Sequence, residues 1–247
     1  AMLFFVLRRL GNMALIMVLV SVAVFLLLEL TPGSVATKVL GPYSSEEQRQ
    51  IWLAAHGYME PLWVRYGSWL LGFIQGEFGQ SIRFKVPVSE VLWPRLWNTT
   101  ILGFWTFAIM IPVSLVLGVL AGMREGRMLD RAISQLSVIT TSIPEFASAV
   151  LFSAIFVFGL KWLPGTSPMS DGFDPVQLIL PVMVLVVYDF GYVTRMTRAS
   201  MAEVMTTQYI RTAVLKGLPY RRVIVRHALR NALIAPFTII MLQVNWL

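Results

Sequence analysis

Residues 98–122 read NTTILGFWTFAIMIPVSLVLGVLAG, a run without one charged side chain. A helix of about 20 mostly apolar residues is long enough to cross the hydrocarbon core of a bilayer. The run therefore predicts a membrane-spanning helix from about Asn98 to Gly122. The composition agrees, because 57% of the chain is hydrophobic and only 13% is charged, whereas roughly a quarter of a soluble domain is charged.

Four further apolar runs flank this segment on both sides. They cover Leu10 to Leu30, about Ala132 to Leu160, about Val176 to Val193, and a last run from about Ala228 that is still apolar at Leu247. The first run is longer than the core of a signal peptide and no small-residue cleavage site follows it, so we expect it to be retained. The sequence thus predicts an all-α fold, a polytopic transmembrane helical bundle with about five spans visible.

The basic residues give the predicted bundle an orientation, because lysine and arginine in short connections stay on the cytoplasmic side. Connection 123–131 holds three arginines, and segment 194–230 holds eight basic residues against one acid, Glu203. We therefore expect the N-terminus and both segments to be cytoplasmic, and 31–97 and 161–175 to lie outside. The net charge of +7 does not indicate nucleic-acid binding, since aromatic residues are not interleaved with the basic ones.

This orientation divides the chain into three predicted parts. Residues 1–30 form a cytoplasmic stub and the first transmembrane helix, residues 31–97 form a periplasmic segment, and residues 98–247 form a core transmembrane domain. In the periplasmic segment, Ser44 and Glu47 have the spacing of a capping box, and the helix they begin should end at Gly57. A second helix is expected from Pro61 to Ile74, with three aromatic residues on one face: Trp63, Tyr66 and Trp69.

The cytoplasmic segment is predicted to contain two helical halves, separated by Lys216-Gly217-Leu218-Pro219. Glycine suits the end of one helix and proline suits the first turn of the next. Before this elbow, one stripe has helical spacing: Tyr209, Ile210, Ala213, Val214 and Gly217. Such a helix could dock into a groove on a partner protein or lie on the bilayer surface, and periodicity alone does not separate these alternatives.

Two acids fall within predicted spans. Glu145, next to Pro144, lies about 20 Å from the inner end of its span at about 1.5 Å per residue. An ionised carboxylate is costly there and should face protein, water or a partner charge. It could line a solute path, with Pro144 allowing a kink, or it could be a protonated or paired structural residue. Asp189 is expected nearer the inner surface, paired with a cytoplasmic lysine or arginine.

Several stretches together resemble the signature of ABC importer permeases, and most closely the dipeptide/oligopeptide/nickel branch. They are Thr194 to Met201, Tyr209 to Ala213, Lys216 to Leu218 and Arg226 to Leu233 in the cytoplasmic segment, with Gln75 to Ser81 outside. Glu77 departs from the pattern, since this branch more often has Asp there. The resemblance covers essentially the whole chain.

The resemblance implies about six spans, the last of them after Leu247, in a bacterial or archaeal cytoplasmic membrane. It implies four kinds of partner: membrane lipid, a second homologous permease, two cytoplasmic ATPase subunits and a solute-binding protein. ATP and Mg would be bound by the ATPases, so no cofactor is expected in this chain. The residues implied to contact the ATPase are Tyr209, Arg211, Thr212, Ala213, Lys216, Gly217 and Leu218, and the periplasmic motif comprises Gly76, Glu77, Gly79 and Ser81.

The transported solute is left open: peptides are expected, with nickel chelates, oligosaccharides and opines as alternatives. A membrane-embedded enzyme is less favoured, because the chain has no cysteine and only two histidines, His56 and His227, predicted on opposite sides. No glycine-rich phosphate loop followed by lysine occurs either, so we expect no ATPase, catalytic or metal site. A channel or secondary transporter is also less favoured. It would act without ATP and often shows internal repeats, which we do not see in this sequence.

Overall fold

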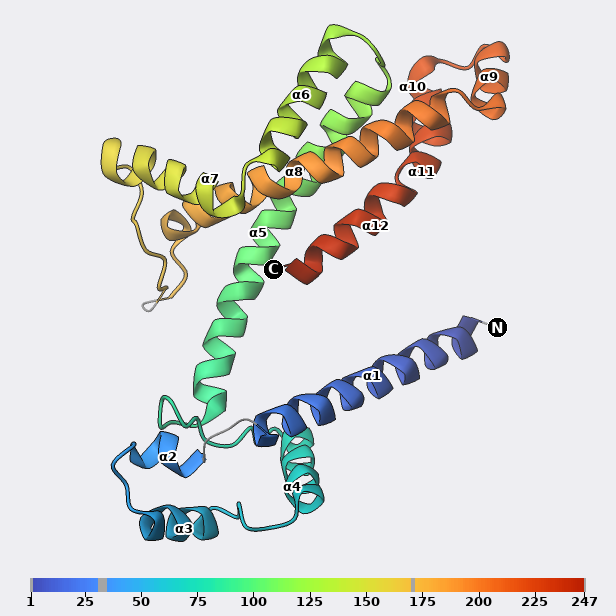
Figure 1. The fold of residues 1–247 in the computed structure, drawn as a ribbon. Helices are drawn as coiled ribbons and strands as arrows, with labels where there is room; N and C mark the ends of the chain where they lie inside the picture. Colours follow the sequence, from blue (N-terminus) through green and yellow to red (C-terminus); the bar gives the residue numbers. More distant parts are fainter. Residues whose placement is uncertain (1, 31–34, 170–171, 247) are drawn as a thin grey trace. The chain divides into compact units, whose positions relative to one another are not determined.

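The computed structural model describes residues 2–30, 35–169 and 172–246, and within these ranges the chain is built from helices (Figure 1). Three helices are long and apolar enough to cross a membrane: α1 (Met2–Leu30), α5 (Val88–Gly122) and α8 (Pro175–Met205). Two bent helix pairs raise the number of candidate spans to as many as five. The prediction of an all-α polytopic bundle is therefore confirmed.

The remaining elements are shorter. They are α2 (Val35–Leu40), α3 (Glu46–Ala55), α4 (Leu62–Gln75), α6 (Met128–Ser142), α7 (Glu145–Phe152), α9 (Gln208–Leu215), α10 (Tyr220–Arg222), α11 (Leu229–Ala232), α12 (Ile234–Gln243), the π-helical η1 (Ser153–Gly159) and η2 (Val223–Ala228), and the 3₁₀ turn η3 (Val244–Trp246). The chain divides into two compact units, one up to Pro94 and one from Arg95.

All three spanning helices are longer than their apolar runs predicted, and α1 begins at Met2 instead of Leu10. α5 begins at Val88 instead of Asn98, and α8 continues to Met205 instead of ending near Val193. The prediction followed where charge began, but charge does not stop a helix outside the hydrocarbon. Residues 194–205 contain neither glycine nor proline, the residues that most strongly disfavour helix interiors.

The third predicted span is broken rather than merely kinked. α6 and the helix formed by α7 and η1 meet at 96°, and Figure 1 shows α7 turning away from the axis of α6. Ile143 is extended, with φ −89° and ψ 122°, as expected of a residue before proline. Pro144 is the N-cap of α7. The final span also bends, by 49° at Leu233, where the Pro236 nitrogen cannot donate back to the preceding helix.

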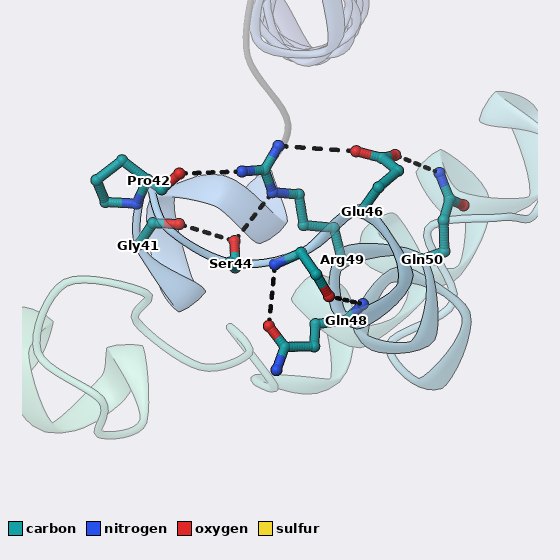
Figure 2. Close-up of polar contacts among 8 residues, drawn as sticks. Gly41, Pro42, Ser44, Glu46, Gln48, Arg49 and Gln50 are labelled. Carbon is teal, nitrogen blue, oxygen red and sulfur yellow. Dashed lines mark hydrogen bonds and ion pairs between the residues drawn. The ribbon is translucent and has the colours of Figure 1, made fainter.

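The N-terminal unit corrects the position of one helix cap. Ser45, not Ser44, caps α3: its hydroxyl accepts from the Gln48 N–H at 3.2 Å, and the Gln48 side chain accepts from the Ser45 N–H at 3.0 Å. Ser44 instead donates to the carbonyl of Gly41 at 2.8 Å and accepts from Arg49 (Figure 2). The capping box therefore begins one residue later than predicted and uses Gln48 rather than Glu47.

Other predictions for this unit are confirmed. The backbone at Gly57, after α3, has φ +74°, and α4 begins at Leu62 directly after Pro61.

α4 packs on α1 through a bidentate ion pair, with Arg65 donating to both carboxylate oxygens of Glu29 at 2.9 and 2.5 Å. The Tyr66 ring also meets Phe25 edge-on at 5.5 Å.

Aromatic rings follow one another along α4. The rings of Tyr66 and Trp69 lie 5.9 Å apart, and Trp69 continues to Phe73 at 5.6 Å. Trp63, the third residue of the predicted aromatic face, is 76% exposed. The row of neighbouring rings thus extends beyond the predicted face to Phe73.

In the second unit, α8 is the central helix, and α6, α7, α11 and α12 pack against it (Figure 1). One buried cluster joins Met110 of α5, Phe190 and Val193 of α8, and Ile240 of α12. Glycines allow close helix approach: a methyl group at Gly191 would lie 2.5 Å from the carbonyl oxygen of Ser137 in α6. This arrangement fixes α8 firmly and positions the segment that follows it.

Candidate functional site

The predicted elbow is present and its geometry follows from the residues that form it. Gly217 has φ +72°, a conformation that favours glycine, and its N–H bonds to the Val214 carbonyl at 2.9 Å. Pro219 then caps α10 with extended backbone. The elbow between Lys216 and Pro219 is therefore a helix stop followed by a helix start, as predicted.

The helical half before the elbow contains a second break, which the sequence analysis missed. α8 ends at Met205 and α9 begins at Gln208, with Thr207 extended at φ −70° and ψ 151°. The hydroxyls of Thr206 and Thr207 donate to the carbonyls of Glu203 and Val204 at 2.8 and 2.6 Å. Threonine side chains that bond to nearby backbone compete with a continuing helix, so α9 is a separate short helix.

One face of α9 is held by the chain itself. Ile210 and Ala213 are buried, at 2% and 6% exposure, in a cluster with Met201 of α8 and Val223 of η2. Two of the five residues of the predicted stripe, Ile210 and Ala213, therefore belong to the core. Tyr209 and Val214, predicted on the same stripe, are 41% and 51% exposed.

The other face of α9 is open to solvent in the described structure. Its exposed side chains are Gln208, Arg211, Thr212, Val214 and Leu215, followed by the exposed C-cap residue Lys216. Leu215 is 87% exposed and was not singled out from the sequence, although a large apolar side chain beside a glycine elbow is a signal that could have found it. Tyr209 accepts a hydrogen bond from Asn231 at 2.8 Å, and Leu218 is half-buried. α9 thus presents an apolar and basic surface on a fixed support.

A buried ion pair near this support was also missed. Arg198 of α8 donates through Nε and Nη2 to the two oxygens of Asp130 in α6, at 2.9 and 2.8 Å. Asp130 is 3% exposed and also accepts from the Gly126 N–H at 2.8 Å. No local pattern in the sequence connects Asp130 with Arg198, because the two residues are 68 positions apart.

The two acids of the predicted spans lie in different environments. Glu145 is exposed at the first turn of α7, which packs against α8, the helix that carries Asp189. Asp189 is 3% exposed and accepts a hydrogen bond from Gln243 of α12 at 2.8 Å. The predicted pairing of Asp189 with a lysine or arginine is therefore wrong, because α8 continues well beyond it to Met205 and places it among α7 and α12.

The motif predicted to be periplasmic forms a tight connection between α4 and α5. Gly76 ends α4 with φ +87°, and the Glu77 N–H reaches back to the Gly72 carbonyl at 2.8 Å. The Gly79 carbonyl accepts from the Val88 N–H at 2.9 Å, and Ser81 accepts from the Phe84 N–H at 3.2 Å. The backbone of this motif thus shapes the turn, and the Glu77 side chain is exposed.

Two family models match the chain. Residues 114–247 match the model described as Binding-protein-dependent transport system inner membrane component, and residues 2–97 match Binding-prot-dependent transport system membrane comp, N-term. These matches cover both the candidate coupling segment and the turn between α4 and α5.

Curated proteins resemble the chain over nearly its whole length. The probable peptide ABC transporter permease protein y4tP of Sinorhizobium fredii is 35% identical over 240 residues, covering 96% of this chain and 77% of that protein. The oligopeptide transport system permease protein AppB of Bacillus subtilis is 32% identical, with 97% and 78% covered. The dipeptide transport system permease protein DppB of the same organism is 34% identical, with 96% and 75% covered.

Proposed function

Because this chain belongs to the family of binding-protein-dependent transport system inner membrane components, we propose that it is the multi-pass permease subunit of an ATP-driven peptide importer. The observation that carries the proposal is the similarity to peptide, oligopeptide and dipeptide permeases over at least 95% of the chain. In this proposal the subunit lies in a bacterial cytoplasmic membrane, with its N-terminus and segment 194–230 on the inner side. It pairs with a homologous permease and receives solute from a binding protein.

We further propose that α9 and the elbow at Gly217 couple this subunit to the ATPases. The support is geometrical: Ile210 and Ala213 fix one face of α9 to the core, while Leu215 and its neighbours remain exposed on the other. A helix fixed on one side and apolar on the other can fill a groove on a partner and pass that partner's motion to α8. ATP and Mg would be held by the ATPases, and this chain would supply no catalytic residue.

The attachment of α9 limits which substitutions can test this coupling. An arginine at Ala213 would have to enter a buried cluster and would disturb the fold before it disturbed any partner. Leu215→Ala removes exposed apolar surface without opening a cavity. We expect it to lower peptide uptake per ATP hydrolysed, and Gly217→Pro to do so more strongly because proline cannot adopt the positive φ that the elbow requires. Normal coupling in both variants would contradict the proposed role of α9.

We also propose that Glu145 lines the solute path. Supporting this, it is exposed at the break before α7. An exposed carboxylate favours solutes that carry a cationic group, such as the ammonium of a peptide. Glu145→Gln should therefore reduce uptake of peptides with a free amino terminus more than that of acetylated ones. If Glu145→Gln leaves the uptake rate of both peptides unchanged from that of the unaltered chain, the proposal is contradicted.

The function as a whole is tested by reconstitution. The permease, purified with its associated subunits and binding protein, is placed in vesicles and supplied with labelled di- and oligopeptides, with and without ATP. We expect uptake only with ATP and binding protein. Uptake without ATP would indicate a channel or secondary transporter. ATP-dependent uptake of a nickel chelate, oligosaccharide or opine in place of peptides would retain the permease assignment and change the substrate.

A further inference from the structure

The ion pair between Asp130 and Arg198 joins two helices that are far apart in sequence. Arg198 lies on α8, two turns before that helix ends, and Asp130 lies in the first turn of α6. Asp130 Oδ2 accepts from Arg198 Nη2 and the Gly126 N–H, both at 2.8 Å, and Oδ1 accepts from Arg198 Nε at 2.9 Å and Ser134 at 3.3 Å. The carboxylate is thus fully hydrogen-bonded and nearly excluded from solvent.

The same region holds α8 tightly against α5. A methyl group at Gly122 would lie 2.7 Å from both the Arg198 carbonyl oxygen and the Met201 Cβ, and one at Gly118 would lie 2.4 Å from the Thr197 Cβ. The helices therefore touch at backbone distance on both sides of Arg198. The ion pair adds the turn 123–127 and the start of α6 to this contact.

The junction is also the place where α9 is attached. Met201, one turn after Arg198, is fully buried and packs in the cluster that contains Ile210 and Ala213 of α9. α9 packs mainly against η2 in this cluster, and Met201 is the buried member of the cluster from α8, so a displacement of α9 would be passed to α8 through the cluster at Met201. Met201 lies against Gly122 of α5, and Arg198, one turn earlier on α8, is bonded to Asp130. Motion of α8 at Met201 would therefore act on both contacts.

We propose that Asp130 and Arg198 are positioning residues for transport, which make the end of α8 and the α5–α6 turn move as one body when α9 is displaced. The inference rests on the proposed function, because it assigns a role to the pair in passing motion from the ATPases to the spans. Packed helices alone can slide past one another. A bidentate pair between arginine and carboxylate resists sliding because its two parallel hydrogen bonds fix direction as well as distance.

Arg198 also contacts a second acid, which provides an internal control. Glu125 lies 3.4 Å from Arg198 Nη2, but its side chain is 57% exposed. Exposed pairs contribute little because water competes for both charges. Glu125→Gln therefore removes a carboxylate from the same arginine without touching the buried contact.

The test uses the complete complex in vesicles, with peptide uptake and ATP hydrolysis measured on the same sample. For Asp130→Asn and Arg198→Gln we expect uptake per ATP to fall by about 5-fold or more, the lower range of typical coupling between sites, with ATP hydrolysis retained. Arg198→Lys keeps the charge but cannot form the two-pronged contact, so it should fall between these variants and the unaltered chain. If the Asp130→Asn and Arg198→Gln complexes do not assemble, Arg198→Lys still tests the inference. Glu125→Gln should match the unaltered chain.

The possible outcomes distinguish failure of this inference from failure of the proposed function. A lower amount of assembled complex with unchanged uptake per ATP would make the pair merely structural and overturn the inference. Equal loss in Glu125→Gln would overturn it too, because the buried geometry would then be irrelevant. Absence of ATP-dependent uptake by the unaltered chain, with peptides and with the alternative solutes, would overturn the proposed function and this inference with it. If the unaltered chain takes up solute with ATP and the Asp130 and Arg198 variants keep the same uptake per ATP, the inference alone is overturned.

Discussion

Replacing Gly118 by alanine tests the close packing of α5 on α8 directly. In most helices this change would add stability, because alanine favours a helix over glycine by about 1 kcal/mol. Here the new methyl carbon would lie 2.4 Å from the Thr197 Cβ and 2.8 Å from the Thr194 carbonyl oxygen. Neither atom is the end of a flexible side chain, so the two helices would have to separate.

The expected magnitude follows from opposing effects. Overpacking a well-packed interior typically costs about 1–3 kcal/mol, and occasionally more. Because a contact at 2.4 Å is severe, we take the upper part of that range and subtract the gain of about 1 kcal/mol in helix propensity. A net loss of about 2 kcal/mol corresponds to a fall in Tm of about 4–8 °C for a chain of this size.

The measurement is the thermal unfolding of the purified protein in detergent, compared at one heating rate. Gly67→Ala in α4 is the matched control, because nothing lies within 4 Å of the methyl group it would add. It should leave Tm unchanged or raise it. A Gly118→Ala protein as stable as the unaltered chain would refute the close α5–α8 contact.

Three further predictions concern α9, the buried acid and the first cap. Ile210→Ala should destabilise the protein by about 2–5 kcal/mol, because it opens a cavity in the core. Leu215→Ala should stay within about 0.5 kcal/mol in the same thermal assay, since that side chain is exposed. Gln243→Leu should cost about 1–3 kcal/mol by removing the donor to the buried Asp189, and a Tm equal to that of the unaltered chain would show that this contact is absent. Ser45→Ala should weaken α3 by about 1 kcal/mol, seen as faster hydrogen exchange in residues 46–55, and unchanged exchange would contradict the assigned cap.

Local chemistry explains which elements could be predicted. The stop at Gly217 and the start after Pro219 depend on the backbone of those residues, so the elbow was found correctly. The cap of α3 was misplaced by one residue, because Ser44 and Ser45 are both good caps. Only the turn beginning at Gly41, which engages the Ser44 hydroxyl, decides between them.

Contacts between distant segments were outside the reach of sequence patterns. Nothing near Asp189 in the sequence indicates that its partner is Gln243 at the end of α12, and the positively charged segments gave a reason to expect a lysine or arginine instead. The stripe on α9 had the right period, but periodicity cannot say whether an apolar face meets the chain's own core or a partner. The structure assigns Ile210 and Ala213 to the core.

The sequence by itself determined that this chain enters a membrane and is helical, because a bilayer requires long apolar runs whose backbone groups bond within each segment. It also determined the elbow, because Gly217 adopts the positive φ that ends one helix and Pro219 begins the next. The tertiary structure alone decided that the third span breaks by 96°, that Gln243 of α12 donates to the buried Asp189, and that Arg198 of α8 holds Asp130 of α6. These features depend on helix packing, whose geometry is set jointly by residues that no local pattern connects.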